Sequence, residues 1–110
     1  MKRIVSEGMA ARRTAAVAEV NAHYNRLAHA DAHRDAAHAK KRAGAASILA
    51  GGDAYPEFHA EAELLGLSSV AFAEMIASKP DRAAVRELDR QRAMRAIETA
   101  TQPADLEGLI

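Results

Sequence analysis

The sequence predicts an all-α protein, and three observations lead to that class. Alanine, the strongest helix former, is abundant along the chain. No proline or glycine occurs between Met9 and Arg42, so nothing interrupts a helix there. Apolar residues recur at spacings of three and four, and no segment shows the alternation of a strand. We therefore expect a long N-terminal alanine-rich helix followed by a compact C-terminal unit of three to four short helices.

The expected long helix carries one apolar stripe. Its members recur every three or four residues and share one face: Val17, Val20, Tyr24 and Leu27. After Leu27 this face continues only with small or polar residues. A helix of about 33 residues would be about 50 Å long. We expect this helix either to pack on another chain, which would give a homo-oligomer, or to fold back through the glycine-containing hinge after it.

The stretch G-G-D-A-Y-P at 51–56 separates the two helical regions. Gly44 is expected to loosen or end the long helix, and the Gly51-Gly52 pair to stop any further turn, because glycine loses the most backbone entropy in a helix. Pro56 suits the first position of a new helix. The predicted organisation is a helical arm over 1–50, a hinge over 51–56 and a C-terminal helical unit over 57–110.

The second half contains most of the large apolar side chains. A helix beginning at Pro56 is expected to end at Gly66, Ser68 or Ser69 to cap the next one, and Pro80 to open a third. In the third helix, acidic and basic residues three apart can form ion pairs. A last short turn starts near Pro103. Within these helices the apolar residues at helical spacing are Phe58, Ala62 and Leu65, then Phe72, Met75 and Ile76, and then Val85, Leu88, Met94 and Ile97, which alternate with charged residues.

Composition excludes several classes of function. The chain has no cysteine, so disulfides and thiol chemistry are excluded. Fifteen basic and fifteen acidic side chains cancel, so no global field attracts nucleic acid. The basic stretches at 1–13 and 38–42 are interpreted as solvated helix ends. No apolar run approaches the roughly 20 residues that span a bilayer. We expect a soluble cytoplasmic protein without a membrane contact.

The histidines invite a metal hypothesis that their spacing does not support. His29 and His33 are four apart on the expected long helix, where two imidazoles can share a metal. A zinc site needs three or four ligands from more than one direction, and no H-E-x-x-H motif is present. We expect these side chains to face solvent or to make hydrogen bonds between helices, and we expect no metal and no cofactor.

Catalytic and DNA-binding patterns are also weak. His59 and Glu63 are four apart in an acidic segment, but no nucleophile motif or phosphate-binding loop occurs, and no Ser-His-Asp set can be argued from spacing. We therefore expect no catalytic residue. Ala62, Gly66 and Phe72 fit a helix-turn-helix, yet the would-be recognition helix offers no Arg, Asn or Gln for base edges. DNA binding stays a third alternative.

Residues 48–110 resemble the C-terminal part of small alanine-rich proteins of phage and prophage tail gene clusters, some of them described as tail or tail-fibre assembly chaperones. The motifs that carry the resemblance are I-L-A-G-G-x-x-Y-P at 48–56, G-L-S-x-x-x-F-A-x-x-I at 66–76, R-A-I at 95–97 and A-T-Q-P-A-D-L-E-G-L-I at 100–110. Gln102 and Pro103 depart from the family pattern. The resemblance implies a helical interaction protein of the bacterial host cytoplasm or the virion.

The sequence interpretation is thus a non-enzymatic protein-interaction module whose partner is a phage tail component or a host protein. An inhibitor of a host defence protein, as anti-CRISPR proteins are, is the main alternative. The expected contact residues are Val17, Val20, Tyr24, Leu27, Tyr55 and Phe58. Tyr55 combines ring area with a wet hydroxyl, which is favoured at interface hot spots. The alternative is that Tyr55 only covers the core beside Phe58.

Overall fold

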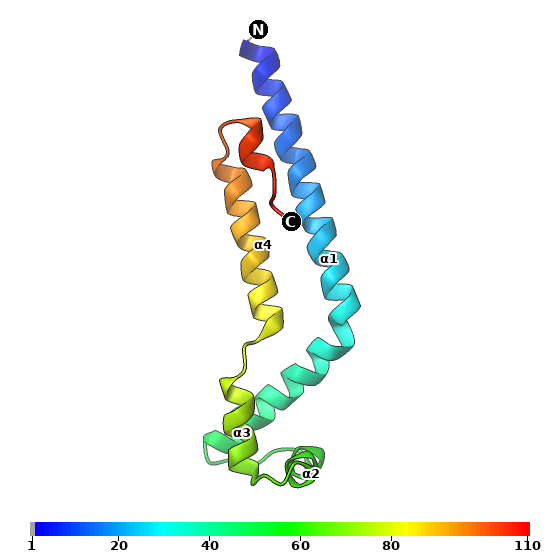
Figure 1. The fold of residues 1–110 in the computed structure, drawn as a ribbon, viewed down its shortest axis with the longest axis vertical. Coiled ribbons are helices and arrows are strands. Elements are labelled where there is room, and N and C mark those ends of the chain that lie inside the picture. The colour runs from blue at the N-terminus through cyan, green and yellow to red at the C-terminus, as the bar shows by residue number, and fades with distance from the viewer. Residues whose placement is uncertain (1) are drawn as a thin grey trace. The chain divides into compact units, whose positions relative to one another are not determined.

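The computed structural model describes the backbone from residue 2 to residue 110 and the side chains from residue 8 onward. Its elements follow the order α1 (Lys2–Leu49), α2 (Pro56–Leu64), α3 (Ser69–Ser78), α4 (Arg82–Thr99) and the short 3-10 helix η1 (Pro103–Leu106), as Figure 1 shows. No strand occurs within residues 2–110. The predicted all-helical class and the long N-terminal helix are confirmed.

Helix α1 is longer than expected, because Gly44 neither ends nor interrupts it. The helix continues to Leu49 and stops where Gly51 takes a left-handed backbone conformation with φ of 87°. The amide of Gly51 donates to the carbonyl of Ile48 at 3.0 Å, and the amide of Gly52 donates to the carbonyl of Ser47 at 2.8 Å. Positive φ is a conformation that glycine adopts without steric cost, which explains the stop at Gly51.

The chain divides into two units along lines that differ from the expected arm, hinge and C-terminal unit. The first unit combines the chain up to Ala30 with Ala83–Ile110, and the second is Asp31–Arg82. The G-G-D-A-Y-P stretch therefore lies inside the second unit. Helix α4, which was expected to pack with α2 and α3, groups instead with the first part of α1.

In the first unit, α4 runs beside the N-terminal part of α1 (Figure 1). Ala16 and Val20 of α1 pack with Ala93 and Ile97 of α4 in one buried cluster. The guanidinium of Arg13 also donates to the carbonyl of Ala100 at 2.6 Å, just beyond the end of α4. A positive charge is favourable at that helix end.

The second unit packs the last turns of α1 against α2 and α3. Its buried cluster is built on the two phenylalanines, with ring centroids 4.9 Å apart, and consists of Ala45, Phe58, Ala62, Phe72, Ala73 and Ile76. Gly44 is buried beside this cluster. A methyl group at Gly44 would lie 3.0 Å from Cδ2 of Phe58 and 3.2 Å from Cε1 of Tyr55. The glycine thus permits close approach of the two rings to α1.

Several local predictions are confirmed. Ser68 is the N-cap of α3, and its side chain accepts a hydrogen bond from the amide of Ala71 at 3.0 Å. In α4, Glu87 pairs with Arg90 at 2.8 Å and Asp89 pairs with Arg92 at 3.5 Å. These features depend on residues three positions apart, so they are determined by helix geometry alone.

Candidate functional site

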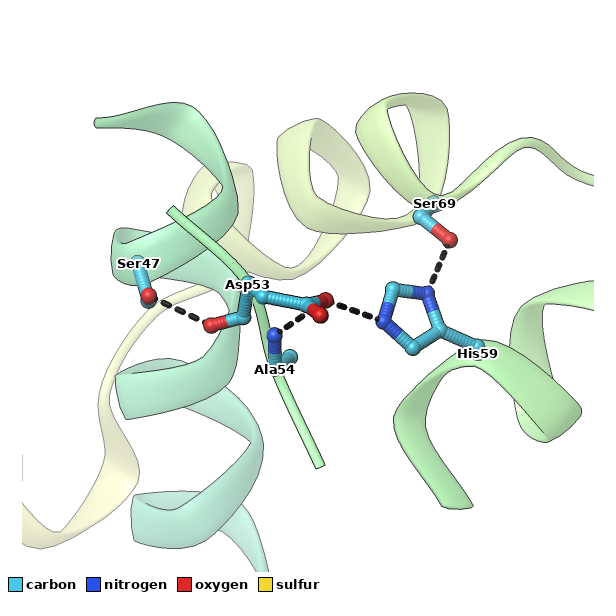
Figure 2. A network of polar contacts seen from close by, with 5 residues as sticks. All are labelled: Ser47, Asp53, Ala54, His59 and Ser69. Atoms are coloured by element: carbon cyan, nitrogen blue, oxygen red, sulfur yellow. Dashed lines mark hydrogen bonds and ion pairs between the residues drawn. The ribbon is translucent and has the colours of Figure 1, made fainter. Parts of the chain in front are cut away.

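A polar network at the start of α2 joins four segments of the second unit (Figure 2). His59 lies at its centre: Nε2 is 2.6 Å from Oδ1 of Asp53, and Nδ1 is 2.6 Å from Oγ of Ser69. The same Asp53 oxygen accepts a hydrogen bond from the amide of Ala54 at 2.8 Å. The hydroxyl of Ser47 donates to the backbone carbonyl of Asp53 at 2.5 Å. The network therefore connects the end of α1, the 51–55 loop, α2 and the first residue of α3.

The Asp53, His59 and Ser69 side chains have the connectivity of a catalytic triad, but their environment does not favour catalysis. The Asp53 side chain is 85% exposed and that of His59 is 39% exposed. In a Ser-His-Asp triad, a buried carboxylate holds the imidazole in one tautomer and stabilises the imidazolium. Water competes for the same hydrogen bond at an exposed carboxylate. We interpret the network as a structural clamp on the 51–55 loop.

Hydrogen bonds hold the carboxylate of Asp53 in its charged form. The amide of Ala54, and then the imidazole of His59, lower the pKa of Asp53 below its usual value. Both groups donate to the ionised carboxylate and neither can donate to it equally well once it is protonated. The loop is consequently best held when Asp53 is charged.

Sequence reasoning missed this network. It placed His59 with Glu63, four residues further along α2, and found no Ser-His-Asp set. The partners of His59 are instead Asp53 in a loop and Ser69 at the start of the next helix. No periodicity relates positions 53, 59 and 69, so no pattern in the sequence could have indicated their contact.

The other histidines lie along α1. His29, His33 and His38 are exposed, and His23 is half-buried with its ring centroid 4.9 Å from that of Tyr24 in an edge-to-face contact. Among the residues with described side chains, no group of three or more His, Cys, Asp or Glu could hold a metal ion. The i, i+4 pair of His29 and His33 thus has no third protein ligand in that part of the chain.

The apolar stripe of α1 is largely covered by its own chain. Val20 is 1% exposed and belongs to the cluster between α1 and α4. Val17 and Tyr24 are half-buried and pack against the same cluster. Leu27, at 39% exposure, is the most open of the four. Part of the stripe is thus covered by α4 of the same chain.

Tyr55 and Phe58 lie together but differ in exposure. Phe58 is 1% exposed, so its side chain is a core residue and presents no surface to a partner. Tyr55 is half-buried against the same cluster, with its ring centroid 5.9 Å from that of Phe58. The ammonium of Lys40 lies 4.4 Å from the centre of the Tyr55 ring, a cation–π contact. A Tyr55→Ala change can therefore show whether this side chain stabilises the core, contacts a partner, or does both.

A more exposed apolar group surrounds the turn between α2 and α3. Leu64 is 84% exposed, Leu65 is 52% exposed and Val70 is 51% exposed. All three lie within seven consecutive residues around Gly66, whose φ of 71° sharpens the turn. Leu65 was expected on the buried face of α2, but it is the C-cap residue, where the helix ends and the face no longer continues. Exposed large apolar side chains that form a contiguous patch are typical of interaction sites.

Three exposed carboxylates on α2 and α3 have no basic side chain paired with them in the described part of the chain. Glu57 and Glu63 on α2 and Glu74 on α3 are exposed. In the described part of the chain, no ion pair joins these three carboxylates to a basic side chain. We call the group formed by Leu64, Leu65, Val70, Glu57, Glu63 and Glu74 the α2–α3 surface.

Comparisons with known proteins do not assign the chain to a class. No protein family model matches it, and neither a curated protein nor a solved structure is detectably similar to it. None of the helices in the described residues is long and apolar enough to cross a membrane. A functional proposal therefore depends on the geometry of the surfaces above.

Proposed function

We propose that this chain is a non-enzymatic protein-interaction module and that its α2–α3 surface binds a partner protein. The observation that carries the proposal is the exposure of Leu64, Leu65 and Val70 around one tight turn. Fully burying a leucine or valine side chain is worth about 1.5–3 kcal/mol. The neighbouring core residues, Phe58 and Phe72, already hold α2 and α3 together without these three side chains.

The contact residues proposed here differ from those expected from the sequence. Val20 and Phe58 are each 1% exposed, so they are core residues and cannot contact a partner in this structure. Hot spots at interfaces are apolar or aromatic anchors that become desolvated on binding. Leu64 has the most exposed surface to lose among the large apolar residues whose exposure is described. We therefore place the centre of the contact at Leu64.

The proposed biological setting is the assembly of a phage tail, inside the bacterial host cell or on the virion. This part of the proposal is supported by the resemblance of residues 48–110 to proteins of phage and prophage tail gene clusters. The α2–α3 surface lies within that range. A tail component is then the partner, and the module acts as an assembly chaperone or a tail-associated factor.

A helix-turn-helix role is less well supported by the geometry. Helix α3, which would enter the major groove, carries Glu74 and no lysine or arginine. DNA recognition relies on basic side chains for the phosphates and on Arg, Asn or Gln for base edges. An acidic side chain on the recognition helix would be repelled by the phosphates instead.

Site-specific photo-cross-linking in the native host tests the proposal. Leu64 is replaced by the photoreactive residue p-benzoylphenylalanine, and Leu88 of α4, which is 49% exposed, is replaced in a matched control. We expect position 64 to cross-link to one specific protein and position 88 not to cross-link to it. Adding Val70→Ser to the position-64 variant should reduce the yield at least about tenfold, since one apolar contact is lost.

The identity of the captured protein separates the remaining alternatives. A tail component supports the assembly role, and a host defence protein supports the inhibitor role. Absence of any specific product at position 64, or equal products at positions 64 and 88, would refute the α2–α3 surface as the binding site.

A further inference from the structure

We propose that the partner segment which binds the α2–α3 surface is an amphipathic helix with basic side chains beside its apolar face. This inference rests on the proposed interaction role of that surface and adds the chemistry of the partner. It follows from the arrangement of apolar and acidic side chains on α2 and α3 and from the absence of basic ones there.

On α2, an acidic and an apolar residue share the outward face. Glu57 and Leu64 are seven residues, or about two turns, apart, which places them along one side of the helix, and both are exposed. Glu61, between them, is half-buried and pairs with Lys41 of α1. Phe58 and Ala62 are buried on another side.

Helix α3 repeats this combination. Val70 and Glu74 are four residues apart and share one face. Phe72, two positions after Val70, is buried, and two positions correspond to roughly 200° around a helix. Val70 and Glu74 thus face away from the core, as Leu64 and Glu57 do on α2.

The charge on this part of the chain has a single sign although the whole chain is neutral. Residues 43–78 contain five acidic side chains and no lysine or arginine. Lys41 of α1 approaches from outside this range and pairs with Glu61 at 2.8 Å. The carboxylates of Glu57, Glu63 and Glu74 remain to attract a basic partner, because complementary charges steer association and fix its register.

The negative charge of the α2–α3 surface also argues against nucleic acid and anionic lipids as its partner. Nucleic acid and anionic lipid surfaces both carry negative charge, so three exposed carboxylates would repel them. An amphipathic helix presents apolar anchors at i, i+3 and i+4, which can cover exposed leucine and valine side chains. A helix with apolar anchors and flanking lysine or arginine can cover the exposed apolar side chains and pair with the exposed carboxylates of the surface.

Fluorescence anisotropy with synthetic peptides tests the inference on the full-length protein. The probe is a labelled peptide of about 15 residues made of Leu and Lys at amphipathic spacing, a length near the minimum for helix formation. One control peptide has the same composition in an order that scatters the leucines around the helix. A second has Glu in place of every Lys. We expect saturable binding of the first peptide, at least about tenfold tighter than that of either control.

Protein variants locate the binding. Leu64→Ser should weaken the Lys/Leu peptide at least about tenfold, and Val70→Ser, as an independent apolar change, should also weaken it, whereas Leu88→Ser on α4 should not. Replacing Glu57, Glu63 and Glu74 together by Gln should weaken binding several-fold and reduce its dependence on salt. The matched control replaces three exposed acidic residues of the first unit by Gln: Glu19, Glu98 and Glu107.

Four outcomes would overturn the inference. The first is equal binding of the scrambled or the Glu-containing peptide. The second is equal weakening by Leu64→Ser and Leu88→Ser. The third is equal weakening by the two sets of Glu→Gln changes. The fourth, seen by light scattering, is self-association that Leu64→Ser abolishes, since a second copy would then occupy the surface.

Failure of the inference can be told apart from failure of the proposed function. If position 64 cross-links to a specific partner in the host but the Lys/Leu peptide neither binds nor competes with that partner, the site is right and the partner chemistry is wrong. If position 64 captures nothing, the site itself is refuted.

Discussion

Adding one methyl group at Gly44 tests how closely α1 packs against the second unit. In an exposed helix interior, Gly→Ala stabilises by about 1 kcal/mol, because alanine loses less backbone entropy. At Gly44 the new methyl group would lie 3.0 Å from Phe58, 3.2 Å from Tyr55 and 3.4 Å from Ala54. Contacts at such distances require the neighbours to move, and Phe58 is 1% exposed with Phe72 packed behind it.

The magnitude follows from the two opposing terms. Overpacking a well-packed core costs about 1–3 kcal/mol, and the helix propensity of alanine offsets about 1 kcal/mol of that cost. We therefore expect Gly44→Ala to lower the free energy of unfolding by about 1 kcal/mol. The matched control is Gly8→Ala in the same helix, where, among the described atoms and apart from its chain neighbours and the nearby backbone of α1, none lies within 4 Å of the added methyl group. It should leave stability unchanged or raise it by up to about 1 kcal/mol.

Urea denaturation followed by circular dichroism measures both variants. A double-mutant cycle with Tyr55→Ala adds a second readout, because removing the tyrosine ring makes room for the methyl group. The cost of Gly44→Ala should then be smaller in the Tyr55→Ala background. Stabilisation by Gly44→Ala equal to that by Gly8→Ala, or an unchanged cost in the double mutant, would refute the close packing.

Two further expectations concern a ring and a carboxylate. Tyr55→Ala should lower the free energy of unfolding by about 1–3 kcal/mol, since a half-buried ring and its contact with Lys40 are lost. Tyr55→Phe, which keeps the ring, should retain most of the stability. If Tyr55→Ala instead abolished partner capture at position 64 and left the melting temperature unchanged, Tyr55 would be a binding hot spot. The Arg90 side chain, and then that of Gln91, lower the pKa of Glu87 from 4.5 to about 2; because the folded pKa lies below the unfolded one, the stabilisation is present above about pH 4.5 and is lost as the pH falls toward 2. Melting temperature measured against pH should therefore fall less steeply across that window for Glu87→Gln than for the wild type, with Glu19→Gln as the control for removing one charge, and identical slopes for Glu87→Gln and the wild type would contradict the assignment.

Some features of this protein were determined by the sequence alone. The long alanine-rich helix, the cap at Ser68, the helix opened after Pro80 and the Glu87–Arg90 pair depend on residues close together in the chain. Backbone entropy, capping and i, i+3 contacts act over one or two turns, so the local sequence contains all the information they need. The charge asymmetry of residues 43–78 is likewise present in the sequence.

The tertiary structure decided which of these helices share a core. Helix α4 packs on the first part of α1 through Ala93 and Val20, although a compact C-terminal unit was expected. Gly44, which as a local signal suggests a helix break, is retained in α1 because the rings of Phe58 and Tyr55 lie against it. The contacts of His59 with Asp53 and Ser69 and the exposure of Leu64 arise in the same way. These features depend on distances between segments that local propensity does not specify, because burial is gained only when particular faces of separate helices meet.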